Sequence, residues 1–477
     1  MEQKLSLRWF LGLSIAFVLL NGVMIYWEIF WAPLLPIALL IAYYTFTSID
    51  KILYLIAFAT PLSVNLSSYT DGIGMSLPSE PLMILVTGIF FLKVLSGFEY
   101  DKAILKHPVS IAIFAFFGWL LISSITSEIP LVSFKFIAAR LWFIIPFYFF
   151  GALLFKKVSN IHLFIWLYAI ALCIVIIYTT IRHSSYGFDE DIGHWIMDPF
   201  YNDHTAYGAM IAFFIPVMTS FIFDKTYKSY KRLLIFVILG ILLIGLYLSY
   251  CRAAWLGIAA SIGIWVVIKL KIRASVIAVV SVSLISLFLM LRTEVIHTLE
   301  KNKQDASDNF VEHIQSMSNI STDASNLERL NRWSCAFRMF ELRPVTGWGP
   351  GTYQFCYAPF QYSYERTIIS TNAGTLGNAH SEYIGPLAET GLPGALIVVG
   401  LYVTILISGI RVYFRASKGN HKLLTLAVVL AFITYLIHGF LNNFLDTDKA
   451  AVPFWAFAAM IVALDLYIVP KKVLEES

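Results

Sequence analysis

Long apolar runs limit what this chain can fold into more than any other feature of its sequence. Fourteen of them follow one another, most close to the roughly 20 residues that a helix needs to cross a bilayer. Only 13% of the residues are charged, about half of what a soluble domain carries, so a water-soluble fold is excluded. The predicted spans lie near residues 9–26, 29–47, 51–66, 81–97, 108–125, 136–155, 161–181, 206–223, 233–250, 253–269, 274–291, 392–410, 423–440 and 451–469.

The sequence therefore predicts an all-α polytopic membrane protein. The third run is short and broken by Pro61, so we expect 12 to 14 transmembrane helices. Lys and Arg in short loops are retained on the cytoplasmic side. With fourteen spans and both termini cytoplasmic, 21 basic residues lie inside, whereas outside the long loop only five lie on the opposite side: Lys135, Arg140, Arg182, Arg252 and Lys449. This distribution favours cytoplasmic termini, and the net charge of +4 gives no reason to expect a nucleic-acid partner.

One connection is far longer than the others. Residues 292–391 form an external loop of about a hundred residues, among connections that are mostly below twenty. The sequence thus predicts three parts: 1–291 with about eleven spans, the loop 292–391, and 392–477 with about three spans. Because long loops on rigid scaffolds often carry binding and catalytic residues, we expect the functional site there.

The second half of this loop has a helical pattern. In LERLNRWSCAFRMFEL the apolar residues Leu330, Trp333, Phe337 and Phe340 recur at helical spacing, which predicts an amphipathic helix on the membrane surface. Pro344 ends it, and GWGPG then predicts a tight turn. A second helix is expected from about Ser381 through Glu389, before the next span.

Two arginines of the first loop helix are candidates for anion binding. Arg329 and Arg332 are three residues apart and share a helix face, so both guanidinium groups can grip one polyanion, whereas Arg338 points elsewhere. The alternative is that they contact lipid headgroups.

Two further arginines lie on the external side within or beside spans. Arg252, in SYCRAAWLG, sits where two spans meet through almost no loop, and Arg140 lies about one turn into the sixth span. Ionisable residues at membrane depth are costly and indicate function by default, although an arginine at a helix end can also extend its charge into the interface.

Two external histidines are candidate proton acceptors. His380, in GNAHSEYIGPLAETG, precedes the helix that re-enters the membrane, and His204 begins another span. A histidine with a near-neutral pKa can take a proton from a hydroxyl, but a histidine in a loop can also be a solvated residue or a helix cap.

Metal and nucleotide sites are not indicated. The only external acidic cluster, Asp189 to Asp191, is consecutive rather than spaced like a metal site, and no CxxC or phosphate-binding glycine motif is present. Cys335 and Cys356 both lie in the external loop, which suggests a disulfide if the compartment is oxidising. We therefore expect neither a metal nor a cofactor.

Several of these segments, taken together and in order, resemble the O-antigen ligase and polymerase family of bacterial inner-membrane glycosyltransferases. They are SYCRAAWLG, ERLNRWSCAF, RPVTGWGPGTYQF and AHSEYIGPLAETGLPG, and the resemblance covers roughly residues 245–410. It implies a GT-C-type fold and a metal-independent transfer of a glycan from undecaprenyl diphosphate to an acceptor hydroxyl on the periplasmic side. The partners are then the carrier-linked glycan, a lipid or glycan acceptor, and membrane lipids.

The resemblance also assigns residues. Arg252 and Arg329 match the diphosphate-binding arginines of the family, and His380 matches its essential histidine; Arg332 and Arg140 are added from position alone. The family often has Asn after this histidine, whereas this chain has Ser381 and Glu382. This difference leaves the identity of the acceptor open. Lipid A core is the expected acceptor; a growing glycan or a protein is the alternative within the family, and a polysaccharide transporter or flippase the alternative outside it.

Overall fold

The computed structural model of the chain describes residues 2–28, 33, 35–66, 74–273, 283, 286, 327–366, 370 and 377–469. These residues belong to two compact units, Met1–Leu55 and Ile56–Ser477. The first unit contains α1 (Glu2–Tyr26), α2 (Leu35–Thr47) and the first turns of α3 (Ile49–Leu62). Large apolar side chains along α1 and α2 are exposed, as expected for helices in contact with lipid.

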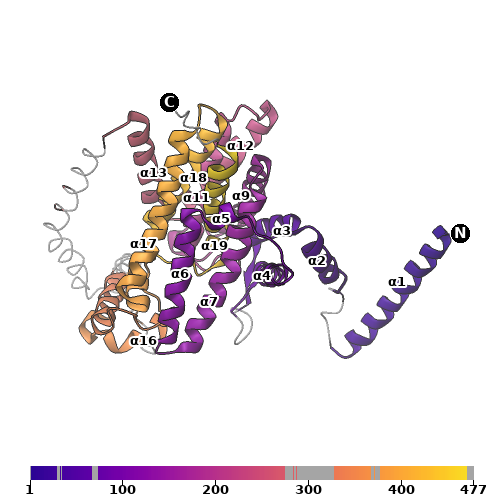
Figure 1. The fold of residues 1–477 in the computed structure, drawn as a ribbon, viewed down its shortest axis with the longest axis horizontal. Helices are drawn as coiled ribbons and strands as arrows, with labels where there is room; N and C mark the ends of the chain where they lie inside the picture. The colour runs from indigo at the N-terminus through magenta and orange to yellow at the C-terminus, as the bar shows by residue number, and fades with distance from the viewer. Residues whose placement is uncertain are drawn as a thin grey trace. The chain divides into compact units, whose positions relative to one another are not determined.

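The second unit contains the remaining elements (Figure 1). After α3 they are β1 (Val64–Asn65), β2 (Ser76–Leu77), α4 (Ser79–Leu95), α5 (Lys102–Leu105), α6 (Pro108–Ile125), α7 (Pro130–Ile144), the π-helical η3 (Ile145–Phe150), α8 (Gly151–Leu154), α9 (Val158–Ser184), α10 (Glu190–Gly193), α11 (His204–Phe223), α12 (Ser229–Leu248), α13 (Arg252–Leu270), a helix over 327–342, α16 (Tyr353–Cys356), η4 (Ala358–Phe360), η5 (Ser363–Glu365), α17 (Ile384–Arg415), α18 (Asn420–His438), α19 (Asp448–Ala463) and the π-helical η6 (Leu464–Ile468). The two short strands form an antiparallel pair.

The predicted fold class is confirmed. Nine helices in the described part of the chain are long and apolar enough to cross a membrane, so the protein is an all-α, multi-pass membrane protein. Each predicted span corresponds to a helix except 274–291, of which the structure describes only residues 283 and 286. The polar segment 301–326 lies outside the described residues. However, α2, α3 and α4 have only 13, 14 and 17 residues, and Pro61 lies in the last turn of α3.

One helix forms the centre of the second unit. Every residue of α19 is buried, as expected for a helix that is apolar on all sides. Phe457 of α19 packs against Phe213 of α11, with ring centroids 4.7 Å apart, and Tyr168 of α9 stacks on Phe214 of α11 at 4.5 Å. By contrast, α12 and α13 bury few residues and expose apolar side chains, which places them at the lipid-facing edge.

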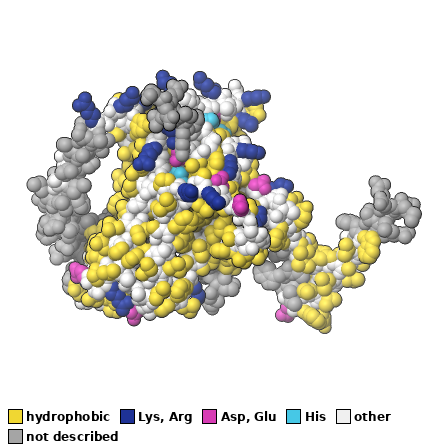
Figure 2. All heavy atoms as spheres, viewed as in Figure 1, with side chains coloured by type: hydrophobic (Ala, Val, Ile, Leu, Met, Phe, Trp, Pro, Cys, Tyr) yellow, Lys and Arg dark blue, Asp and Glu magenta, His cyan; other side chains and the backbone are white. Residues whose placement is uncertain are grey.

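Charged side chains are unevenly distributed over the second unit. Figure 2 shows Lys and Arg gathered near the upper end of the view. Residues 344–366 and the start of α17 lie at the opposite end (Figure 1), which we call the external end, after the predicted topology. The assignment of this end to the outside of the cell is a prediction from the charge pattern.

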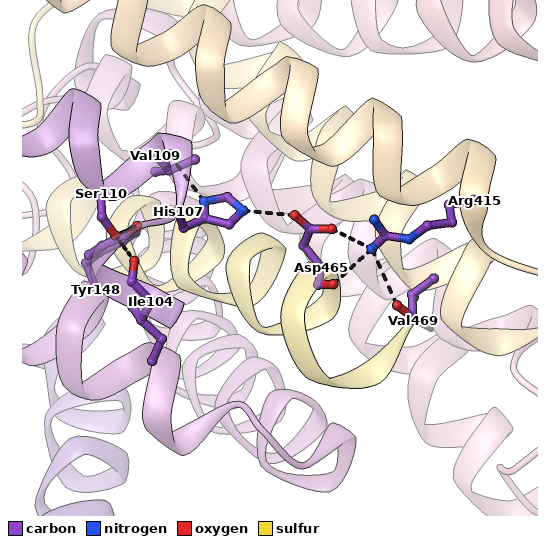
Figure 3. Close-up of polar contacts among 8 residues, drawn as sticks. All are labelled: Ile104, His107, Val109, Ser110, Tyr148, Arg415, Asp465 and Val469. Atoms are coloured by element: carbon purple, nitrogen blue, oxygen red, sulfur yellow. Dashed lines mark hydrogen bonds and ion pairs between the residues drawn. The ribbon is translucent and has the colours of Figure 1, made fainter. Parts of the chain in front are cut away.

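At the other end, a polar cluster joins three helical segments. Asp465 of η6 contacts His107, just before α6, at 3.0 Å between Oδ2 and Nε2, and it pairs with Arg415 at the end of α17 (Figure 3). The other nitrogen of His107 accepts from the backbone N–H of Val109, so both ring nitrogens are used. We call His107, Asp465 and Arg415 the Asp465 cluster.

The GWGPG segment folds against a break in α17. Gly391 has φ 69°, which interrupts the helix and leaves carbonyl groups of the preceding turn without helical partners. The backbone N–H groups of Trp348 and Gly349 donate to the carbonyls of Ala388 and Glu389 at 3.0 and 2.8 Å. Leu392 donates in return to Pro344 O at 2.9 Å. This backbone pairing fixes the loop on the first turns of α17.

Gly347 is the residue that makes this close approach possible. Its φ is 68°, and a Cβ there would lie 2.3 Å from the backbone carbon of Glu389. We expect Gly347→Ala to destabilise the protein by more than about 1 kcal/mol, because both the backbone conformation and the space disfavour a side chain. Thermal aggregation of the purified protein in detergent measures this effect. The matched control is Gly263→Ala in α13, where a Cβ meets nothing within 4 Å; an equal loss of stability in both variants would contradict the interpretation.

Candidate functional site

The loop helix 327–342 presents an unexpected face to the protein. Its buried residues include Asn331, Cys335 and Met339, which pack with the aromatic residues that follow the GWGPG turn. The stripe that the sequence predicts as the apolar face is only partly buried, and Phe337 on it is 46% exposed. Small residues allow the close packing on the inner side, so the larger apolar residues remain on the outer side, where they can meet lipid headgroups.

Arg332 is held on the buried side of this helix. Its Nε donates to Glu328 Oε1 at 2.7 Å, and its guanidinium lies 3.8 Å from the centroid of the Tyr357 ring. It also packs against Gly377, where a Cβ would lie 1.9 Å from Nη1. Because of these contacts, Arg332 is a fixed positive charge.

Arg329 lies nearer to the membrane helices. Its Nε donates to Leu441 O, just after α18, at 3.3 Å, and burial lowers its pKa. Its neighbours include the Cys251 thiol and the Asp203 carboxylate, so it faces the external ends of α11 and α13. Arg329 thus links the loop helix to the top of the transmembrane bundle.

His380 lies close to both arginines and has an unusual backbone conformation. Its φ is 48°, in the left-handed region that few non-glycine residues adopt, and its N–H donates to Asn378 Oδ1 at 3.0 Å. Burial, and next the charges of Arg329 and Arg332, lower the pKa of His380 to about 4. The ring is therefore neutral near pH 7 and able to accept a proton.

The two residues after His380 have structural roles. Ser381 Oγ accepts from the N–H groups of Tyr383 and Ile384, both at 3.3 Å, at the start of α17. Glu382 accepts from Tyr435 Oη at 2.7 Å and from Leu445 N at 3.0 Å. Burial, and next the charge of Asp446, raise the pKa of Glu382 to about 7. Ser381 and Glu382 therefore anchor the histidine to α17, α18 and the loop before α19.

Arg140 belongs to another part of the external end. It is buried in α7, pairs with Asp446, donates to the carbonyl of Leu445 and lies 4.5 Å from the ring centroid of Phe136. Arg140, Phe136 and Asp446 line one cavity together with Asn378. The role of Arg140 in binding a substrate stays a prediction from sequence position.

Arg252 is the first residue of α13, and its side chain is exposed. Within the part of the chain that the structure describes, it has no hydrogen bond or ion pair. The residue before it, Cys251, is a neighbour of Arg329. Arg252 and Arg329 therefore belong to the same region of the external end.

The site also contains residues that the sequence did not single out. Asp203 accepts from the N–H groups of Thr205 and Ala206, at 2.7 and 2.8 Å, and so caps α11. It also faces Arg329 and His380. The other predicted histidine, His204, stacks on His194 with ring centroids 4.3 Å apart. His438, at the end of α18, contacts Asn442 at 3.1 Å. The sequence YNDHTAYG predicts that Asp203 caps a helix, but it does not predict that Asp203 lies near Arg329 and His380.

Two cavities open at the external end, and both reach Asn378, two residues before His380. One, of about 300 Å³, extends between the β1–β2 region, the start of α11 and the loop before α19. The other, of about 360 Å³, lies between α7, the residues after the GWGPG turn and the start of α17. Both are lined by Asn378, Asn443 and Asp446, so they adjoin each other. Cavities of this size accommodate sugar-sized ligands.

The predicted disulfide is not formed. Cys335 and Cys356 are both free thiols in the structure, although they pack in one core cluster. Cys335 Sγ instead lies 3.5 Å from Phe360 O, and burial raises the pKa of this thiol to about 11. No group of three or more metal-ligating side chains is found among the described residues.

Comparison with known proteins adds one finding. Residues 237–399 match the family model of the O-antigen ligase domain. None of the curated proteins matches the chain. The matched segment includes Arg252, Arg329, Arg332 and His380, but not Arg140. The chain is thus a multi-pass membrane protein in which residues 237–399 match the O-antigen ligase family domain.

Proposed function

We propose that the protein transfers a glycan from undecaprenyl diphosphate to an acceptor hydroxyl on the periplasmic side of the bacterial inner membrane. Lipid A core is the proposed acceptor, both termini are cytoplasmic, and neither a metal nor a cofactor takes part. The observation that carries this proposal is that His380 has Arg329 and Arg332 as neighbours within the matched domain, and that two adjoining cavities are lined by Asn378, whose side chain accepts from the N–H of His380.

The arginines are the proposed diphosphate site. A diphosphate leaving group gains negative charge as its bond to the sugar breaks, and fixed guanidinium groups in a partly buried setting stabilise that charge. Arg332 is held by Glu328 and Tyr357, and Arg329 by Leu441 O, so little reorganisation is needed when the donor binds. Arg252, exposed at the start of α13, is placed to complete the site from the side of the bundle. Arg140, paired with Asp446, is proposed to contact the donor only from the second cavity.

His380 is the proposed base. The acceptor hydroxyl oxygen attacks the anomeric carbon, the bond from that carbon to the phosphate oxygen breaks, and undecaprenyl diphosphate leaves with the electron pair. The hydroxyl proton passes to the imidazole of His380. An imidazole with a pKa of about 4 is a weak base, but a bound diphosphate would offset the charges of Arg329 and Arg332 and so raise this pKa. The base therefore becomes stronger when the donor is present.

The test is a transfer assay on the purified full-length protein. With an undecaprenyl-diphosphate glycan and lipid A core, we expect release of free undecaprenyl diphosphate and a glycosylated core, without added metal or nucleotide. Chelator in the buffer should change nothing. The products formed in a deletion strain separate the family alternatives: unmodified core with long carrier-linked polymer indicates a ligase, whereas core carrying one repeat unit indicates a polymerase. No release with any acceptor would refute the proposal.

The same assignment predicts two different pH profiles. As the pH falls through the pKa of His380, the ring becomes protonated and can no longer accept a proton, so the rate falls. For kcat/KM of the donor, which reports the free protein, the acid limb is expected near pH 4. For kcat, which reports the complex, it is expected at higher pH because the bound diphosphate raises the pKa. Steady-state rates between about pH 3 and pH 8 measure both limbs. A kcat limb at or below the pH of the kcat/KM limb would contradict the role of the arginines.

A further inference from the structure

The cavity of about 300 Å³ is lined mainly by acidic and carboxamide side chains. We call it the acceptor cavity. Four carboxyl side chains line it, from Glu80, Asp203, Asp446 and Asp448, together with one ammonium, from Lys449. Arg329 does not line this cavity, although it is an electrostatic neighbour of the lining residue Asp203. A diphosphate fits the region around Arg329, so the acceptor cavity is left for the other substrate.

The ammonium group of Lys449 points away from the cavity and binds oxygen atoms of the protein. Lys449 Nζ donates to the carbonyls of Thr60 and Ser63, both at 2.6 Å, and to the Ser63 hydroxyl. Arg140 pairs with Asp446 from the side of the second cavity. Both cations are therefore committed to protein oxygens.

The other lining groups match the surface of a sugar. Asn202, Asn378 and Asn443 carry carboxamides, each of which can donate and accept hydrogen bonds. Phe200, Tyr201 and Phe444 add aromatic surface. Sugar hydroxyls can donate to the carboxylates and both donate to and accept from the carboxamides. A phosphate or carboxylate group has mainly acceptor atoms, which the carboxylates of this cavity cannot satisfy.

The acceptor cavity is also connected to the proposed base. Asp203 lines the cavity and is an electrostatic neighbour of His380. Asn378 lines it as well, and its side chain accepts from the N–H of His380 at 3.0 Å. A hydroxyl of a sugar held in this cavity is thereby brought toward the imidazole.

From these observations we infer that this cavity binds the terminal sugar of the acceptor and selects a neutral or amine-bearing sugar over one that carries a phosphate or carboxylate. This inference rests on the proposed glycan transfer. It means that the negative charge of the cavity decides which acceptor sugars bind. An amine-bearing sugar gains from the carboxylates, and a neutral sugar from the carboxamides.

The experiment compares matched acceptors with the purified protein and one donor. A glycolipid acceptor is offered with its terminal sugar either unmodified or phosphorylated away from the reacting hydroxyl. We expect kcat/KM for the phosphorylated form to be at least about tenfold lower, because like charges are brought together. Asn443→Lys, which adds a cation to the cavity wall, should reduce this gap, and Asn202→Lys, on the exposed rim, is a second variant in case the first does not fold.

Ser185→Lys is the matched control. Ser185 is exposed near the external end of α9 and does not line the acceptor cavity, so this variant adds the same charge and should keep the wild-type ratio. Equal efficiency with both acceptors in the wild type, or an unchanged ratio in both cavity variants, would overturn the inference while leaving glycan transfer intact. If no undecaprenyl diphosphate is released from the donor with either acceptor, the proposed function itself is refuted, and the inference with it.

Discussion

Replacing His380 with alanine is expected to lower kcat for glycan transfer by about 10²- to 10⁴-fold, the range that general base catalysis contributes. The imidazole is neutral near pH 7 and faces both arginines, so its removal leaves the acceptor hydroxyl without a proton acceptor at this position. Donor binding should change little, because the diphosphate contacts are made by arginines. Release of undecaprenyl diphosphate in single-turnover reactions measures the effect directly.

The matched control for His380→Ala is His421→Ala. His421 is exposed in the first turn of α18, at the end opposite to His380, and should tolerate the change. His380→Asn tests the same role with a side chain that keeps polarity and favours the left-handed backbone conformation. Full transfer by His380→Ala at wild-type expression would show that His380 is not the base.

Replacing Arg329 with alanine is expected to reduce kcat/KM for the donor by about 10²- to 10³-fold, comparable to the loss of one preorganised donor to a developing charge. It should also raise the pKa of His380, because a positive neighbour that lowers it is removed. The acid limb of kcat/KM then moves to higher pH. A loss of activity through misfolding alone would not move this limb, so the pH profile separates the two explanations.

Arg329→Lys serves as the conservative variant. A lysine restores the charge without the planar fork, so we expect partial recovery of activity and most of the original pH profile. Arg366→Ala is the control, because Arg366 is exposed at the end of the described loop. If Arg329→Ala bound and turned over the donor like the wild type, the diphosphate would have to be bound elsewhere.

The helices of this protein could be predicted from its sequence because they depend on local patterns. Apolar runs gave the position of each described span, and Pro344 and the glycines of GWGPG gave the end of the loop helix and the turn. The backbone pairing of that turn with α17 could not be predicted, because it depends on Gly391, more than forty residues later. A break in a helix is visible in the sequence, but what covers its free carbonyls is not.

The candidate site shows the same division. Arg329, Arg332 and His380 could be selected by residue type and motif, and the structure brings them together. Asp203 could not, since it lies well over a hundred residues from them and resembles an ordinary helix cap. Arg140 was selected by its depth in a span, and the structure pairs it with Asp446, while its role as a substrate ligand stays a prediction. Depth alone does not distinguish a substrate ligand from one half of a buried ion pair.

The contacts of α6 and α17 have a mechanical consequence. At the external end, Trp119 Nε1 of α6 donates to Thr390 O of α17 at 2.8 Å, and Ser123 Oγ donates to Thr346 O at 2.6 Å. At the other end, the Asp465 cluster ties the residue before α6 to the last residue of α17 (Figure 3). The two helices are thus fastened together at both ends and act as one strut. We expect motions that widen the two cavities to displace the surrounding helices rather than to separate α6 from α17.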